Sequence, residues 1–306
     1  MNPRKIWIDC DPGVDDLSAI ILAYRMGLDI VGISSVAGNA THENTYRNAR
    51  DIVAFMGETT PVYGGAEKPL MRELETAPHV HGENGLGNLT IEPSTAPHEE
   101  KKAWDALYEA ACRYDDLTVV AVGPLTNIAL ALLKYEDLAD KLGEIAIMGG
   151  SAKFGNATPK AEFNIYADAE AAKIVFDSGL FVHMFGLDVT LEGYLTDDER
   201  AHLAKVSPRE GGLIARAFEH MGDFIRSLGL PGVCLHDALP ILNLGYPELF
   251  TSDTAHVDVE TKSTLSYGET VTDLYSDRQY EPKNARVYLS IDREKFLAIV
   301  EELLTK

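Results

Sequence analysis

The sequence contains few cysteines, and they are widely separated. Cys10, Cys112 and Cys234 are the only three in 306 residues. An odd number without close spacing argues against a disulfide framework and against a cysteine-ligated metal site. We therefore predict a protein of a reducing compartment and place it in the cytoplasm.

The sequence is also poor in positive charge and in long apolar runs. Lys and Arg number 27 against 48 Asp and Glu, which gives a formal net charge of -21. Nucleic acids and anionic membranes are bound through basic patches, so neither is expected as a partner. No stretch approaches the roughly 20 apolar residues of a membrane-spanning helix. The composition favours a small neutral or cationic ligand instead.

Short apolar runs alternate with longer helical patterns, and no linker rich in proline, glycine or serine divides the chain. This alternation is typical of βαβ units, so we predict an α/β fold: an open, mainly parallel sheet flanked by helices, in a single domain over 1–306. Strands are expected at 5–10, 29–36, 117–123, 144–150, 180–186, 256–262 and 285–292, and helices at 15–27, 43–57, 101–114, 124–135 and 167–179. Residues 196–245 are expected to form a helix-rich capping segment, and residues 79–88 an irregular loop.

The stretch DCDPGVDD, residues 9–16, places four carboxylates between a strand and a helix. Such close like charges raise one another's pKa unless a cation or hydrogen-bond donors stabilise them. Ligands of open parallel sheets bind beyond the carboxyl ends of strands, where this loop lies. Oxygen ligands without His or Cys favour Mg²⁺ or Ca²⁺ over zinc. Two other interpretations stay open: the second acid pair merely caps the helix, or the first pair holds Mg²⁺ as in phosphoaspartyl hydrolases.

Further polar side chains are expected at the same edge of the sheet. They are Asn39, Asn156, Glu162 and Asn164, whereas His236 and Asp237 are expected at the start of a later helix, where Asp237 could supply the metal with another oxygen and His236 could face a substrate. The amides and the glutamate of GNATPKAEFN, residues 155–164, can together bind several hydroxyls of a polyol such as a sugar. Taken singly, most of these residues are explained as well or better by a turn or a helix cap. Their combination is what points to a ligand.

Eight short motifs follow one another along nearly the whole chain. They are DCDPGVDD, VAGN, HGENG, VGPLTNIA, MGG, GNATPKAEFN, LHD and VDVETK. In this order they resemble the calcium-dependent nucleoside hydrolases of the inosine–uridine-preferring family, whose hallmark is DxDPGxDD. The resemblance implies an open, mainly parallel sheet, a hydrolase that releases free base and ribose from ribonucleosides, and a homodimer or homotetramer.

The resemblance also implies roles for individual residues. Ca²⁺ would be held by the carboxylates of Asp11, Asp16 and Asp237 and by the main-chain carbonyl of Val122. Relatives carry Thr at the last position, but a carbonyl ligand does not need the hydroxyl. Asp11 would also act as general base for the attacking water, and His236 as the acid for the leaving base. The implied substrate contacts are Asp15, Asn39, His81, Asn156, Glu162 and Asn164.

Two alternatives to this function remain at the level of sequence. One is a Mg²⁺-dependent phosphohydrolase, although no Lys, Ser or Thr is clearly placed for a phosphate. The other is a catalytically silent nucleoside- or ribose-binding protein, against which Asp11 and His236 argue. The choice between purine and pyrimidine bases is not decided, because His220 and Phe224 occupy a region in which relatives use tyrosine hydroxyls.

Overall fold

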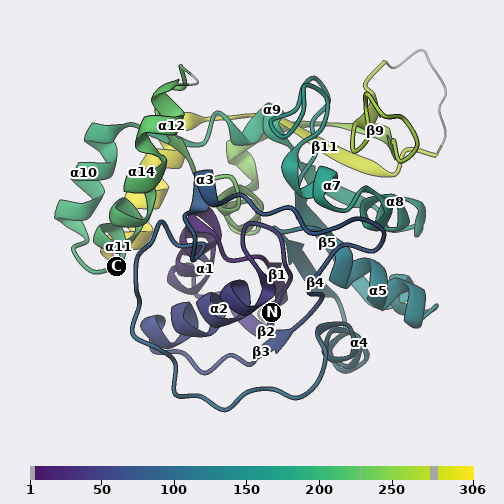
Figure 1. Ribbon diagram of the computed structural model, residues 1–306, viewed down its shortest axis with the longest axis horizontal. Coiled ribbons are helices and arrows are strands. Elements are labelled where there is room, and N and C mark those ends of the chain that lie inside the picture. The colour runs from purple at the N-terminus through teal and green to yellow at the C-terminus, as the bar shows by residue number, and fades with distance from the viewer. Residues whose placement is uncertain (1–3, 228, 276–281) are drawn as a thin grey trace.

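The computed structural model describes residues 4–227, 229–275 and 282–306. Within them, nine strands form one sheet in the order β10-β9-β11-β6-β5-β4-β1-β2-β3 (Figure 1). Their bounds are β1 Lys5–Cys10, β2 Asp29–Ser35, β3 Val62–Gly64, β4 Leu117–Ala121, β5 Leu142–Met148, β6 Val182–Phe185, β9 Phe250–Val259, β10 Thr270–Asp273 and β11 Ala285–Ile291. A separate antiparallel pair consists of β7 Tyr194–Leu195 and β8 Val233–Cys234.

The sheet is parallel from β3 to β11 and antiparallel only where β9 pairs with β11 and β10. This confirms the predicted open, mainly parallel sheet. The carboxyl ends of parallel strands meet at one edge of a sheet, so the loops after β1, β2, β4 and β5 lie side by side. These are the loops that carry the predicted site residues.

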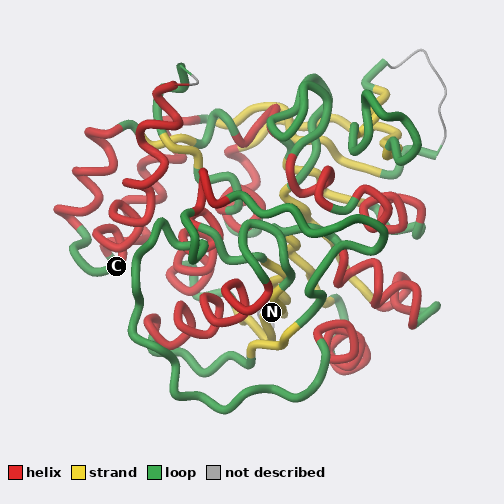
Figure 2. The backbone as a smooth tube through the Cα atoms, viewed as in Figure 1, coloured by secondary structure: helices red, strands yellow, loops and turns green. Residues whose placement is uncertain are grey.

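Helices cover both faces of the sheet, as Figures 1 and 2 show. Alternation along β1 explains the two layers: Ile6 and Ile8 are buried in one hydrophobic core, and Trp7 in the other. The first core is covered by α1 Val14–Arg25, α2 His42–Met56, α11 Glu210–Ala217, α13 Ala238–Asn243 and α14 Arg293–Thr305. The second is covered by α4 Ala103–Arg113, α5 Thr126–Lys134 and α8 Ala169–Asp177.

The remaining helices are short or belong to the segment 196–245. They are α3 Pro78–His81, α6 Leu138–Lys141, α7 Phe163–Ala167, α9 Leu187–Thr190, α10 Asp197–Val206, η1 Phe218–Met221, α12 Gly222–Ser227 and η2 Pro247–Leu249. Segment 196–245 thus contains α10, α11, η1, α12 and α13. No helix in the described ranges is long and apolar enough to cross a membrane.

The structure corrects several sequence predictions. The helix expected at 167–179 is α8, and an additional short helix, α7, precedes it; the side chain of Glu162 caps α7 and that of Asp168 caps α8. The expected loop 79–88 begins within the short helix α3. Strands β3 and β10 and helix α14 were not predicted. Both strands are at most four residues long, so their own side-chain patterns are too brief to indicate a strand.

Candidate active site

A cavity of about 570 Å³ opens at the carboxyl edge of the parallel strands. Its polar lining includes Asp15, Asn39, His81, Asn156, Glu162, Asn164, His236 and Asp237, together with Val122. These residues come from loops and helix starts that are far apart in the sequence. Asp15, Asn39, Asn156, Glu162 and Asn164 were predicted to lie at this edge, whereas His81 and Val122 were implied only by the family resemblance. The topology therefore brings the predicted substrate-binding residues into one cavity.

Asp11 is buried directly after β1, and two glycines make room for it. A Cβ added to Gly38 would lie 2.1 Å from Asp11 Oδ2, and one added to Gly123 would lie 2.7 Å from Asp11 Oδ1. The backbone N–H of Asn39 donates to Asp11 Oδ2 at 2.7 Å. Asp11 Oδ1 has no hydrogen-bond partner within the structure. The carboxylate is therefore fixed through one oxygen while the other stays available.

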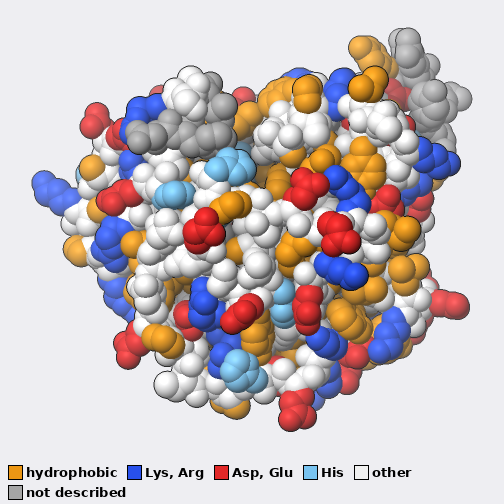
Figure 3. Space-filling model, viewed as in Figure 1, with side chains coloured by type: hydrophobic (Ala, Val, Ile, Leu, Met, Phe, Trp, Pro, Cys, Tyr) orange, Lys and Arg blue, Asp and Glu red, His pale blue; other side chains and the backbone are white. Residues whose placement is uncertain are grey.

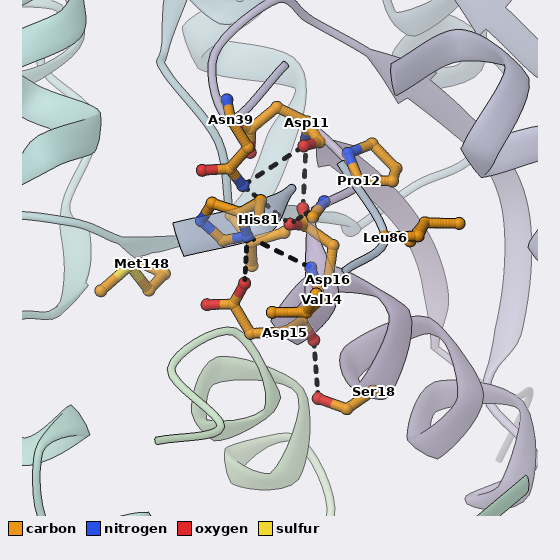
Figure 4. Close-up of polar contacts among 12 residues, drawn as sticks. Asp11, Pro12, Val14, Asp15, Asp16, Ser18, Asn39, His81, Leu86 and Met148 are labelled. Carbon is orange, nitrogen blue, oxygen red and sulfur yellow. Dashed lines mark hydrogen bonds and ion pairs between the residues drawn. The ribbon is translucent and has the colours of Figure 1, made fainter. Parts of the chain in front are cut away.

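Asp16 is held by the turn that precedes it. Its Oδ1 accepts from the backbone N–H of Asp11 at 3.1 Å, and its Oδ2 accepts from Gly13 N–H at 2.8 Å. The side-chain amide of Asn39 also donates to Oδ2 at 3.1 Å (Figure 4). These donors stabilise a carboxylate at the start of α1, where the helix dipole also favours negative charge.

Asp15, Asp16 and Asp237 form an acidic cluster, with one oxygen from each lying within 4.8 Å of the others. Burial raises the pKa of Asp15 to about 8 and that of Asp16 to about 6. Burial and repulsion from neighbouring carboxylates raise the pKa of Asp11 and Asp237 well above the usual range. In the described part of the chain no Lys or Arg forms an ion pair with these four side chains.

The donor set fits a hard divalent cation. All the groups are oxygens, and the Oδ1 atoms of Asp11 and Asp15 are buried acceptors without a hydrogen-bond partner among the described residues. Buried carboxylates at this density repel one another unless a positive charge lies among them. The carboxylates that the structure brings within ligand distance of one another are Asp15, Asp16 and Asp237, so Asp16 and Asp237 are suited to hold such an ion. The expected participation of Asp11 and of the Val122 carbonyl stays a prediction from the family resemblance.

Asn164 connects the Val122 carbonyl to the other side of the cavity. Its Nδ2 donates to Val122 O at 2.9 Å and to Met148 O at 3.1 Å. A carbonyl oxygen has two lone pairs, so this bond leaves Val122 O able to accept a second contact. Asn164 was predicted as a substrate contact, and it also positions the proposed carbonyl ligand.

Glu162 and Asn156 have structural contacts in addition to lining the cavity. Glu162 accepts from the N–H groups of Asn164, Gly150 and Ile165 at 2.9, 2.9 and 3.2 Å, and Asn156 Oδ1 accepts from Phe163 N–H at 2.9 Å. Burial raises the pKa of Glu162 to about 7. Both side chains are therefore held in place by the start of α7.

Two histidines line the cavity opposite these amides. His81 Nδ1 accepts from Val14 N–H at 3.3 Å and lies 3.8 Å from Asp15 Oδ1 (Figure 4). His236 Nδ1 lies 2.8 Å from Thr190 Oγ1. Burial lowers the pKa of His81 to about 3 and that of His236 to about 4, so both rings are neutral at pH 7.

The outer wall of the cavity is largely apolar and comes from α3, η1 and α12. Val80, Met221 and Ile225 line it, together with Leu191 and Leu230. Figure 3 shows histidine side chains on the surface around α3. His220 Nε2 lies 3.2 Å from Pro78 O and is not among the lining residues, whereas the side chain of Phe224 lies outside the described residues.

The sequence did not indicate every functional feature of the site. Gly38 and Gly123 were not singled out, although each follows a strand within a quoted motif. The apolar wall was not recognised because its residues also fit an ordinary helix core. Asp9, the fourth carboxylate of DCDPGVDD, does not line the cavity; it contacts Ser34 and Asn127 on the other side of the sheet.

Comparison with known proteins agrees with the fold and with the family resemblance. The family model described as inosine-uridine preferring nucleoside hydrolase matches residues 6–298. A pyrimidine-specific ribonucleoside hydrolase RihA from Photobacterium profundum is 41% identical, covering 98% of both chains. RihA from Escherichia coli is also 41% identical, covering 98% of this chain and 97% of its own.

Solved structures give the same result. A plant nucleoside hydrolase, PpNRh1, superposes with a TM-score of 0.93 at 31% identity, covering 99% of both chains. A purine-preferring ribonucleoside hydrolase from Gardnerella vaginalis has a TM-score of 0.91 at 30% identity, also covering 99% of both. Fold and site thus define a nucleoside-cleaving enzyme of the α/β class. The chain belongs to the inosine-uridine preferring nucleoside hydrolase family, and it is a ribonucleoside hydrolase.

Proposed function

We propose that this enzyme hydrolyses the N-glycosidic bond of ribonucleosides in a Ca²⁺-dependent reaction, releasing free base and ribose. The observation that carries the proposal is the convergence of four buried carboxylates, two with unpartnered oxygens, beside a cavity lined by amides and histidines. A cation explains the carboxylates, and a sugar with several hydroxyls explains the amides.

Calcium suits this donor set better than magnesium. Ca²⁺ accepts six to eight oxygens in flexible geometry, whereas Mg²⁺ demands a small octahedron and keeps several waters. Asp11, Asp16 and Asp237 would hold the ion through carboxylates, and Val122 through its carbonyl. When bound, the ion would attract substrate oxygens, make a nearby water more acidic and favour ionised carboxylates around it.

Asp11 is the general base in this proposal. Its Oδ2 is fixed by Asn39 N–H, and its buried Oδ1 is free to accept the proton of the attacking water. Direct attack on the anomeric carbon releases ribose with inverted configuration. The transition state resembles an oxocarbenium ion, so the negative charge of the neighbouring carboxylates stabilises it.

The ribose is bound by polar side chains around the cavity, in this proposal Asp15, Asn39, Asn156, Glu162 and Asn164. Most of these side chains are already fixed by hydrogen bonds within the protein before the substrate binds. This reduces the conformational entropy that is lost on binding. A 2'-deoxyribonucleoside would leave buried polar groups unpaired, so we expect strong discrimination against it.

The base is bound on the histidine side of the cavity. His236 is the proposed acid for the leaving base; because burial keeps the free ring neutral at pH 7, it would first take up a proton in the substrate complex and then donate it to the base. His81 would contact the base from α3. The curated relatives at 41% identity are named pyrimidine-specific. We therefore propose pyrimidine ribonucleosides, uridine and cytidine, as the preferred substrates.

Release of reducing sugar tests the proposal directly. Inosine, adenosine, guanosine, uridine, cytidine and their 2'-deoxy forms are incubated with the enzyme, with chelator and with added Ca²⁺ or Mg²⁺. We expect chelator-sensitive ribose release that Ca²⁺ restores, fastest for the pyrimidines and lowest for the deoxy forms. Release that survives complete chelation would contradict the metal dependence, and faster cleavage of purines would contradict the base preference.

The family resemblance also supports two properties of the whole protein. We propose a homodimer or homotetramer, which light scattering coupled to size exclusion would measure. We further propose a cytoplasmic enzyme, consistent with three cysteines that are all free, two of them buried. A monomer in the first measurement would contradict the assembly.

A further inference from the structure

A buried group of polar side chains lies beneath the cavity, outside its lining. Asn127, in the first turn of α5, is 1% exposed and has no contact with the cavity. Its Nδ2 donates to Asp9 Oδ1 at 2.8 Å and to Ser35 O at 3.1 Å. Its Oδ1 accepts from the N–H of Ala66 at 2.8 Å. One carboxamide therefore connects the end of β1, the end of β2 and the segment after β3.

Each of these three connections leads to a residue of the site. Asp9 lies two residues before Asp11, and its backbone carbonyl accepts from the N–H of Val122 at 2.7 Å. Ser35 ends the strand that leads to Asn39. Ala66 O accepts from Ala37 N–H at 2.9 Å in the same loop. The carboxamide thus contacts the Asp9 side chain, the end of β2 and the segment after β3, and each of these leads to Asp11, Val122 or Asn39 along the chain or through a hydrogen bond.

The surroundings leave Asn127 little freedom. A Cβ on Gly65 would lie 2.2 Å from Asn127 Oδ1, so the backbone there packs closely on the amide. Asp9 also accepts from Ser34 Oγ, which in turn accepts from Trp7 Nε1 at 2.8 Å. Asp9 Oδ2 has no hydrogen-bond partner among the described residues, but Asp9 Oδ1, Ser34 Oγ and the Asn127 carboxamide are all bonded. Buried hydrogen-bonded groups of this kind fix relative positions more strictly than apolar packing does.

We propose that Asn127 is a positioning residue for the reaction: its carboxamide sets the carboxylate of Asp11 against Asn39 and Val122. The inference rests on the proposed roles of Asp11 and Val122 at a cation. Supporting residues behind metal ligands typically change metal affinity or activity by about 10- to 100-fold when they are removed. We expect losses in this range for Asn127.

Two variants separate the parts of the contact. Asn127→Ala removes all three hydrogen bonds. Asn127→Asp keeps an acceptor for Ala66 N–H but removes both donors, and it places a second carboxyl beside Asp9. If the connection to β1 and β2 matters, both variants lose Ca²⁺ affinity and kcat. If only the Ala66 contact matters, Asn127→Asp behaves like the wild-type enzyme, which would overturn the proposal.

Asn284 provides a matched control. Its side chain also makes three hydrogen bonds to backbone, accepting from Val257 N–H and donating to Val257 O and Phe176 O, at 2.8, 2.9 and 3.2 Å. These contacts join β9 and α8, away from the cavity. Asn284→Ala should lower the thermal midpoint while leaving Ca²⁺ affinity and kcat unchanged.

The measurements are Ca²⁺ titration by calorimetry and steady-state ribose release, on protein shown by circular dichroism to be folded. We expect a roughly 10- to 100-fold weaker Ca²⁺ Kd and a similar fall in kcat for Asn127→Ala and Asn127→Asp. Wild-type Kd and kcat in folded Asn127 variants would overturn the inference. If the wild-type enzyme itself binds no Ca²⁺, the proposed metal role fails instead, and kcat alone then decides the positioning role.

Discussion

The four acids of DCDPGVDD differ in what surrounds each carboxylate. The carboxylate of Asp9 accepts hydrogen bonds from Ser34 and Asn127 and lies in the interior of the fold. Asp11 has one oxygen fixed and one free, whereas Asp16 has several donors. Asp15 faces the cavity and His81. The same residue type is thus found in three different surroundings, which suit the proposed roles in support, catalysis and binding, because local hydrogen bonds decide which oxygens remain available.

Replacement of Asp11 by Asn should abolish turnover without unfolding the protein. Asn keeps an oxygen for the N–H of Asn39 but cannot take a proton from water, and general-base catalysis typically contributes about 10²- to 10⁴-fold. We expect kcat for ribose release to fall by about this factor, or more if the cation is also lost. Near-normal kcat in the variant would disprove the assigned role.

The raised pKa of Glu162 predicts that the stability of the folded protein depends on pH. Its pKa in the folded protein is about 7, above its ordinary value of 4.5, so the folded state binds more protons between these values. Stability contributed by the protonated form is therefore lost as pH rises from about 4.5 to about 7, by up to about 3 kcal/mol.

Urea denaturation of Glu162→Gln checks this linkage. Gln has no titrating proton. The free energy of unfolding of the variant minus that of wild type should therefore be higher at pH 8 than at pH 5. Its missing hydrogen-bond acceptor costs a similar amount at both pH values and cancels in this difference. An equal difference at the two pH values would show that Glu162 titrates normally.

Among the elements, the segment between β3 and α3 is held in part by Arg72, beside the hydrogen bonds of Ala66, Leu70 and Ala77. The Arg72 guanidinium lies 4.3 Å from the ring centre of Tyr166 and 4.7 Å from that of Tyr267. It also donates to Tyr166 O and Tyr166 Oη, each at 3.0 Å. The segment continues into Glu75, Thr76 and Ala77, which line the cavity. Arg72 thus fixes one wall of the site from a distance.

Arg72→Met should raise KM for the nucleoside more than it lowers kcat. Met retains an apolar chain between the rings but loses the cation–π contacts and hydrogen bonds, worth about 1–2 kcal/mol. Steady-state kinetics measures the split. Arg113→Met is the control, because Arg113 stacks on Tyr114 at 6.0 Å, on the exposed end of α4. A fall in kcat with an unchanged KM would mean that Arg72 influences the chemical step instead of substrate binding.

At the scale of the whole molecule, cation binding should be coupled to stability. Buried carboxylates that repel one another destabilise the folded state, and a cation that binds only this state relieves the repulsion. Ca²⁺ at 100 times its Kd should stabilise the protein by about 2.7 kcal/mol. Differential scanning calorimetry should show a higher Tm with Ca²⁺ and a lower one with chelator. The Asp237→Asn variant should show a much smaller shift, and an unchanged response in it would contradict the assigned ligand.

Much of the fold and most of the site could be predicted from the sequence. Alternating apolar patterns located β1, α1, β2 and α2 to within a residue or two at each end, because each has a clear period and a turn on either side. The pattern did not reveal β3 or β10, since their pairing depends on neighbours distant in sequence. The rule that ligands bind at the carboxyl ends of strands brought Asn39 and Asn164 to one edge. Asp237 follows β8 of the separate strand pair, and the sequence indicated it only through its motif and the family resemblance.

The sequence by itself determined the parallel α/β architecture, the concentration of acid after the first strand and the family. Those features depend on local periodicity and on short motifs, which are readable without coordinates. Only the tertiary structure decided that Asp9 faces Asn127 while Asp11 keeps a free oxygen, and that Glu162 caps a helix as well as lining the cavity. The reason is physical: a carboxylate's role depends on which donors surround it in space, and here those donors come from segments up to 118 residues away.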